Sequence, residues 1–214
     1  MSFTDRYRSA GLVRNPFCTQ AIADSEVFIS RGVREPPERY SQTLVQVVAP
    51  RGYGKSTHLA TWRARQDAPY HYIPLRPYGE RWARAPHAPD GLVYGDEIDR
   101  MPAAVRWGWF KRLARGRATL VIGTHTDLSR LGRLAGFAEV RTHTLAPLDL
   151  AGVKTLIEAR LADSQIDASG SRISFSPVEI ARIHQATGGV PRAVEAACHS
   201  LVSEKVSLRT SATS

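Results

Sequence analysis

The sequence contains few cysteines, few lysines and no long hydrophobic run. Its 214 residues include only two cysteines, Cys18 and Cys198, which excludes a disulfide framework and a four-cysteine metal site. No apolar stretch approaches the roughly 20 residues that a membrane-spanning helix needs. The first residues also lack the apolar segment of a secretory signal. We therefore expect a cytoplasmic protein with no membrane association.

Acidic residues are also in short supply. The chain has 29 basic and 20 acidic residues, a formal net charge of +9. Most of the excess falls in residues 1–150, and arginine supplies nearly all of it, because lysine occurs only at positions 55, 111, 154 and 205. A basic balance favours a polyanionic partner such as nucleic acid or nucleotide phosphates. The arginine bias is also explained by genomic base composition, so charge alone leaves both interpretations open.

Hydrophobic patterning predicts strands that alternate with helices over the first two-thirds of the chain. Short apolar runs indicate strands at 43–48, 70–75, 92–95, 118–123 and 139–145. Helical signals lie between them at 55–66, 102–115 and 127–135, and after them at 149–161, 177–187 and 191–204. Asp149 is the expected N-terminal cap of the helix at 149–161. This alternation predicts an α/β fold with a parallel five-stranded sheet flanked by helices. The last helices predict a small all-helical domain, which gives an α/β domain at 1–148 and a helical domain at 149–214.

The strongest local signal is a glycine-rich segment between the first predicted strand and the first helix. Residues 49–57 read Ala-Pro-Arg-Gly-Tyr-Gly-Lys-Ser-Thr. This is close to the phosphate-binding loop, in which backbone N–H groups at a helix N-terminus surround phosphate oxygens. Ala49 stands where the pattern has its first glycine. The predicted nucleotide-binding residues are Pro50, Arg51, Gly52, Tyr53, Gly54, Lys55, Ser56 and Thr57.

Two carboxylates, Asp96 and Glu97, follow the third predicted strand. Because the carboxyl ends of parallel strands meet at one edge of the sheet, both side chains are expected beside the glycine-rich loop. Lys55 would contact the β- and γ-phosphates, while Ser56 and Asp96 would hold Mg²⁺. Glu97 would polarise the attacking water as a general base. The sequence thus predicts Mg²⁺-dependent hydrolysis of a nucleoside triphosphate.

With these two motifs the chain resembles the AAA+ P-loop ATPases over about residues 10–204. It looks most like the compact branch with replication initiators, transposition helpers and switch ATPases, on the segments 15–17, 95–99 and 145–148. The resemblance implies a P-loop NTPase sheet followed by a helical lid, with ATP and Mg²⁺ bound between core and lid. It also implies that an N-terminal extension, residues 1–42, lines the adenine pocket.

The resemblance assigns further residues to the bound nucleotide. Thr124 would be the sensor-1 group near the γ-phosphate, with His125 as its rival. Arg192, in a segment similar to the family's sensor 2, would reach the γ-phosphate from the lid. Asn15 and Phe17 would line the adenine pocket, although Phe17 would equally serve as ordinary core.

The resemblance also implies self-assembly. Arg130 or Arg133 would be the arginine finger that enters a neighbouring subunit's site, and the sequence does not choose between them. A monomer would then be a poor ATPase, and a ring or filament a better one. No substrate-threading machinery is expected, because only about 20 residues separate the second predicted strand from Asp96.

The sequence allows several interpretations of what such an ATPase acts on. The first is action on duplex DNA or a DNA-bound partner, in transposition or replication. It rests on a run of cations without acidic residues around Trp107 and Trp109, namely Arg106, Lys111, Arg112, Arg115 and Arg117. The same pattern also fits a solvated helix face with both tryptophans in the core.

A second interpretation is a nucleotide-dependent signalling switch or chaperone that acts on a partner protein, for example in a defence system, without DNA binding. A third is a nucleotide-binding module that does not hydrolyse. The complete set Lys55, Ser56, Asp96 and Glu97 argues against the third interpretation.

Overall fold

The computed structural model describes residues 7–8, 11–13, 15–17, 31–33, 36, 42–66, 68–73, 91–164 and 173–212. The chain divides into two compact units. One, the core unit, is Gly32–Ala146, and the other, the helical unit, combines Met1–Arg31 with Pro147–Ser214. The division after Ala146 lies close to the expected boundary at 148, and the first 31 residues group with the helices.

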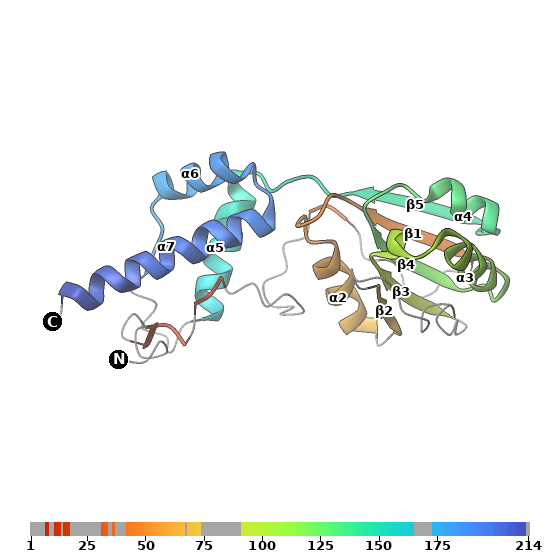
Figure 1. Ribbon diagram of the computed structural model, residues 1–214, viewed down its shortest axis with the longest axis horizontal. Coiled ribbons are helices and arrows are strands. Elements are labelled where there is room, and N and C mark those ends of the chain that lie inside the picture. Colours follow the sequence, from red (N-terminus) through yellow and green to blue (C-terminus); the bar gives the residue numbers. More distant parts are fainter. Residues whose placement is uncertain are drawn as a thin grey trace. The chain divides into compact units, whose positions relative to one another are not determined.

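The core unit contains a parallel sheet of five strands in the order β2-β3-β4-β1-β5 (Figure 1). The strands are β1 (Thr43–Val48), β2 (Tyr70–Tyr72), β3 (Leu92–Asp96), β4 (Thr119–Thr124) and β5 (Glu139–Thr144). This confirms the expected five-stranded parallel sheet. The segment predicted to extend the second strand beyond residue 73 lies outside the described residues. Since all the strands run in one direction, the segments that follow β1, β3 and β4 emerge at one edge.

Helices cover both faces of the sheet. They are α2 (Lys55–Gln66), α3 (Ala103–Arg115) and α4 (Ser129–Ala135), with a short 3-10 helix, η3 (Ile98–Arg100), after β3. Side chains from one face of the strands share a core cluster with α2: Val45, Val47, Tyr94, Val121, Leu59 and Trp62. Side chains from the opposite face share a cluster with α3: Leu44, Val93, Leu120, Ile122, Trp109, Phe110 and Leu113. This division follows from the two-residue period of a strand.

The two tryptophans of α3 have different surroundings. Trp109 is fully buried in the core cluster, so it packs the sheet and is not available to stack on a base. Trp107 is partly buried, and Lys111 Nζ lies 5.1 Å from its ring centroid. Trp107 also packs against this cluster, so the core interpretation describes Trp109 fully and Trp107 in part.

A buried glutamine ties the loop after β4 to the sheet. Gln46 on β1 is fully buried, and its Nε2 donates to Asp127 Oδ1 at 2.5 Å and to Thr142 Oγ1 at 2.7 Å. Its Oε1 accepts from the backbone N–H of Leu128 at 2.9 Å. Because a buried amide is costly unless its hydrogen bonds are made, this arrangement fixes the start of α4 relative to β1 and β5.

The helical unit contains α5 (Leu150–Asp163), α6 (Pro177–Thr187) and α7 (Pro191–Ala212). The expected Asp149 cap is present, because its carboxylate accepts from the backbone N–H of Gly152 at 2.7 Å. Helix α7 continues eight residues beyond its predicted end at 204. Residues from all three helices form one core: Val153, Leu156, Ile157, Leu161, Ile180, Ile183, Val194, Cys198, Val202 and Val206.

Only one of the two cysteines lies in the part of the chain that the structure describes. Cys198 is fully buried in this core, and burial raises the pKa of its thiol to about 12. Cys18 lies outside the described residues. Among the described helices, none is both long enough and apolar enough to cross a bilayer.

Candidate nucleotide-binding site

The glycine-rich loop joins β1 to α2, as expected. Its two glycines have φ angles of 87° at Gly52 and 84° at Gly54, a left-handed region that disfavours residues with a Cβ atom. Helix α2 begins at Lys55, directly after the second glycine. The loop therefore ends in the first turn of a helix, where backbone N–H groups without intrahelical partners suit an anion.

Lys55 is held within this loop. Its Nζ donates to the carbonyl oxygens of Ala49 at 2.9 Å and Pro50 at 3.2 Å, and lies 4.0 Å from Glu97 Oε1. The residue is only 4% exposed. Burial lowers the pKa of the ammonium, and the nearby Glu97 and Asp96 oppose that shift. A buried cation at a helix N-terminus makes the loop strongly attractive to a phosphate group.

Asp96, at the end of β3, is fully buried and accepts hydrogen bonds on both oxygens. Its Oδ2 accepts from Ser56 Oγ at 2.5 Å and from the Tyr70 hydroxyl at 3.0 Å. Its Oδ1 accepts from the backbone N–H of Glu97 at 3.0 Å. The structure thus brings Ser56 and Asp96 together, and a hydroxyl beside a carboxylate is a donor set of hard oxygens that fits Mg²⁺.

Glu97 occupies a left-handed backbone position, with φ 60° and ψ 34°, at the turn into η3. Its Oε2 lies 2.6 Å from Arg100 Nη2 and 3.3 Å from His125 Nδ1. Burial raises the pKa of the carboxyl, against the opposing charge of Lys55. A strained backbone and a raised carboxyl pKa are both common at catalytic positions.

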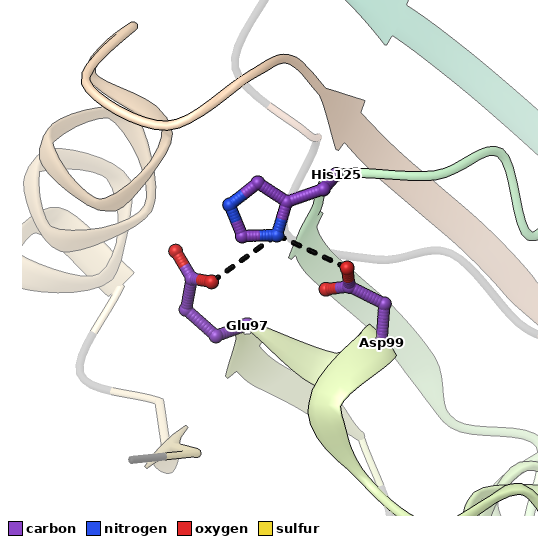
Figure 2. A group of neighbouring side chains, drawn as sticks. All are labelled: Glu97, Asp99 and His125. Atoms are coloured by element: carbon purple, nitrogen blue, oxygen red, sulfur yellow. Dashed lines mark hydrogen bonds and ion pairs between the residues drawn. The ribbon is translucent and has the colours of Figure 1, made fainter. Parts of the chain in front are cut away.

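His125 lies between two carboxylates (Figure 2). Its Nδ1 is 3.0 Å from Asp99 Oδ2 and 3.3 Å from Glu97 Oε2. The ligating atoms of these three residues lie within 4.8 Å of one another, a spacing that a metal ion would accept. Since Arg100 and Lys55 already bring positive charge to Glu97, the arrangement is better suited to orienting that carboxylate.

The two sensor-1 candidates are placed differently. The Thr124 hydroxyl is buried and donates to the carbonyl oxygen of Thr126 at 2.9 Å. The side chain of His125 instead contacts Glu97 directly. Thr124 is the last residue of β4 and His125 directly follows it, at the edge of the sheet that also carries Asp96 and Glu97. The sensor role stays a prediction for each.

The arginine-finger candidates and the predicted DNA-contact residues lie on α3 and α4 or just beyond α3, and most of them are exposed. Arg130 and Arg133 are both exposed on α4. Among the basic residues of the α3 region, Arg112, Arg115 and Arg117 are exposed and Lys111 is partly buried. Arg106 is bound within the protein, because its Nη1 donates to the carbonyl oxygen of Asp99 at 2.9 Å.

Three predicted residues belong to the helical unit. Arg192 is exposed in the first turn of α7. Asn15 is 2% exposed, and its Nδ2 donates to the Tyr7 hydroxyl at 3.2 Å and to the carbonyl oxygen of His199 at 3.3 Å. Phe17 is buried in the helical core. The adenine-pocket and sensor-2 roles of these residues stay predictions.

Four residues of the site were not identified from the sequence. Tyr70 and Gly123 border Asp96, while Asp99 and Arg100 surround Glu97 and His125. The two η3 residues were accessible to sequence reasoning, because they directly follow the Asp96-Glu97 pair. Tyr70 and Gly123 carry no such signal, since their places depend on which strands are neighbours.

Solved structures of similar fold include those of RuvB of Thermotoga maritima, a Holliday junction branch migration motor. RuvB matches with a TM-score of 0.50 and 18% identity over 73% of this chain and 52% of RuvB. Two of its single-residue mutants match with TM-scores of 0.51 and 0.52 and identities of 18% and 17%, over 73% of this chain and 53% and 54% of theirs. The matched part of the chain shares the fold of RuvB, a five-stranded parallel sheet flanked by helices with a helical C-terminal region. At this identity the likeness concerns the fold alone.

The match covers only part of the RuvB chains. This chain spans about half the length of the RuvB chains that it matches. By sequence, it matches no protein-family model and no curated protein.

Proposed function

We propose that the chain binds Mg²⁺ and ATP through residues 50–57 and hydrolyses the nucleotide, with Glu97 as the general base. The observation that carries this proposal is the 2.5 Å hydrogen bond from Ser56 Oγ to Asp96 Oδ2. It joins two segments 40 positions apart, each of which is needed for Mg²⁺-dependent phosphoryl transfer. The AAA+ fold supports the same activity.

The residues of the core unit divide the chemistry among them. Lys55 neutralises charge on the β- and γ-phosphates, and the loop N–H groups orient them. Ser56 and Asp96 would hold Mg²⁺, which when bound offsets further phosphate charge. Glu97 accepts a proton from water as its oxygen bonds to the γ-phosphorus, and the bond from that phosphorus to the β–γ bridging oxygen breaks. The products are ADP and inorganic phosphate.

Two substitutions separate binding from hydrolysis. Lys55→Ala should abolish ATP binding, because it removes the buried cation of the loop. Glu97→Gln should retain binding but lose phosphate release by about 100-fold or more, because it removes the general base. Lys154→Ala is the matched control, since this lysine is exposed on α5. Calorimetric titration and a phosphate-release assay measure the two steps, and no binding of Mg²⁺·ATP by the wild type would refute the proposal.

We further propose that ATP drives self-assembly into a ring or filament, and that the assembly acts on DNA or a DNA-bound partner of the transposition or replication type. Two features of the structure and one comparison support this. Arg130 and Arg133 are exposed on α4 next to Leu134, a large apolar residue that is 64% exposed. Three exposed arginines cluster at the end of α3 and just beyond it, at positions 112, 115 and 117. RuvB, which shares the fold, is a motor for Holliday junction branch migration.

The alternative is a nucleotide-dependent signalling switch or chaperone for an unidentified partner protein. One observation favours it. Arg106, one of the cations predicted to contact DNA, instead donates a hydrogen bond to the carbonyl oxygen of Asp99 within the protein. DNA binding discriminates the two functions, since the switch requires none.

A further inference from the structure

Tyr70 reaches the predicted magnesium carboxylate from the outer strand of the described sheet. It is the first residue of β2, which pairs with β3 in the register Tyr70↔Tyr94 and Tyr72↔Asp96. Its hydroxyl donates to Asp96 Oδ2 at 3.0 Å. At neutral pH a tyrosine hydroxyl keeps its proton and therefore remains a donor. The contact links a short outer strand to the centre of the nucleotide site.

The oxygen that Tyr70 contacts is the one that faces the glycine-rich loop. Asp96 Oδ2 also accepts from Ser56 Oγ, whereas Oδ1 accepts from the Glu97 backbone N–H. Under the proposed function, Ser56 is itself a ligand of Mg²⁺. Tyr70 is then the side chain that holds Asp96 Oδ2 without being a ligand itself. Hydrogen bonds from outside the ligand set orient a carboxylate and tune its affinity for the metal.

The ring of Tyr70 is itself held in place. It is half-buried and packs against the core cluster that includes α2. The guanidinium of Arg63, on α2, lies 5.8 Å from the ring centroid. These contacts do not involve the hydroxyl, so Tyr70→Phe would remove one hydrogen bond and leave the ring and its packing.

We propose that Tyr70 is a positioning residue that fixes the Asp96 carboxylate for Mg²⁺. The inference rests on the proposed function, because it gives Asp96 the task of holding the metal. It assigns β2 a role in metal affinity in addition to its place in the sheet. Loss of the hydroxyl should leave ATP binding without metal unchanged and weaken only the contribution of Mg²⁺.

The same strand supplies a matched control. Tyr72 lies two residues further along β2 and is 49% exposed. Tyr72→Phe removes a hydroxyl from the same strand and leaves in place the hydrogen bonds that Asp96 Oδ2 accepts from Ser56 and Tyr70. The experiment measures ATP binding by fluorescence titration over a series of Mg²⁺ concentrations, and in EDTA. Tyr70→Phe should raise the Mg²⁺ concentration for half-maximal enhancement of ATP binding by about 10-fold, and Tyr72→Phe should leave it unchanged.

The same substitution in a chain that also lacks the Asp96 carboxylate tests whether the effect of Tyr70 depends on Asp96. In an Asp96→Ala chain, Tyr70→Phe should cause no further loss, because the partner of the hydroxyl is already gone. Thermal unfolding of each variant confirms that it is folded. A Tyr70→Phe variant with the Mg²⁺ dependence of the wild type would overturn this inference and leave the proposed function standing. Equal weakening with Mg²⁺ and in EDTA would also overturn it, because that result indicates a purely structural role.

The proposed function fails in a different way. If wild-type protein showed no enhancement of ATP binding by Mg²⁺, both the proposed function and the inference would be overturned. The wild-type titration therefore reports on the function, and the difference between Tyr70→Phe and Tyr72→Phe reports on the positioning role.

Discussion

The carboxylate of Asp96 lies against a position of β4 that has no side chain. A Cβ atom built on Gly123 would lie 2.4 Å from Asp96 Oδ1 and 3.5 Å from Leu59 Cδ2. Real Cβ atoms do not approach another atom as closely as the first of these distances. The absence of a side chain at Gly123 therefore lets the carboxylate keep the orientation in which Ser56 reaches it.

Gly123→Ala should displace Asp96 and weaken Mg²⁺-dependent ATP binding by about 10-fold, with a loss of about 1–3 kcal/mol in the free energy of unfolding from overpacking. Gly108→Ala is the control, because a Cβ atom there meets nothing within 4 Å and α3 should gain about 0.5–1 kcal/mol. Denaturant unfolding and the Mg²⁺ titration measure the two effects. Wild-type Mg²⁺ dependence in Gly123→Ala would contradict the prediction.

Some residues of the site are recognisable from the sequence, and others are not. Lys55, Ser56, Asp96 and Glu97 were predicted because their local motifs carry the chemistry. Gly123 carries no local signal, because its importance comes from the strand that β4 pairs with. His125 contacts Glu97, a contact that depends on side-chain direction at the end of β4 and that only the three-dimensional arrangement fixes. The choice between Thr124 and His125 as the sensor-1 group stays a prediction.

At the scale of an element, α3 has two chemically different sides. Trp109, Phe110 and Leu113 pack into the sheet, while Arg112 and Arg115 are exposed. The apolar side packs this segment against the sheet, and its spacing is the pattern that predicted a helix at 102–115. The exposed cations remain available for a phosphate backbone, and a sequence cannot say whether a cationic helix face contacts solvent or DNA.

Arg112→Gln tests this surface. If the surface binds duplex DNA, the variant should weaken binding irrespective of sequence and reduce the slope of log affinity against log salt by about 0.9. Arg182→Gln, at an exposed position of α6, is the control. Fluorescence anisotropy across a salt series, with and without a non-hydrolysable ATP analogue, measures the binding. Absence of wild-type DNA binding at low salt would remove the DNA interpretation and favour the switch.

At the scale of the whole molecule, the proposed assembly requires that one chain complete another's site. Two exposed arginines on α4 are the candidates, and nothing within the chain chooses between them. Arg130 and Arg133 are three positions apart on one helix, so both lie on neighbouring parts of the same surface. The choice can be made only by pairing chains that each lack a different part.

Mixing complementary variants should identify the finger. Lys55→Ala lacks a working site but keeps its arginines, whereas Arg130→Ala or Arg133→Ala keeps the site. Lys55→Ala and the variant of the true finger should each be nearly inactive alone, whereas the variant of the other arginine should keep its activity. A mixture of Lys55→Ala with the inactive arginine variant should regain ATPase activity. Loss of the finger arginine is expected to lower the ATPase rate by a factor on the order of 10³–10⁵. ATPase activity per chain that is independent of protein concentration, together with no rescue in either mixture, would rule out an arginine acting between subunits.

The sequence by itself determined the order of strands and helices, the glycine-rich loop, the Asp96-Glu97 pair and the Asp149 cap, because each depends on residues close together in the chain. The tertiary structure decided that Trp109 is core, that His125 contacts Glu97, and that Tyr70 and Gly123 border Asp96. Those outcomes depend on strand order and on which side chains meet across the sheet. Pairing of distant segments is a property of the folded chain as a whole, and local patterns do not encode it.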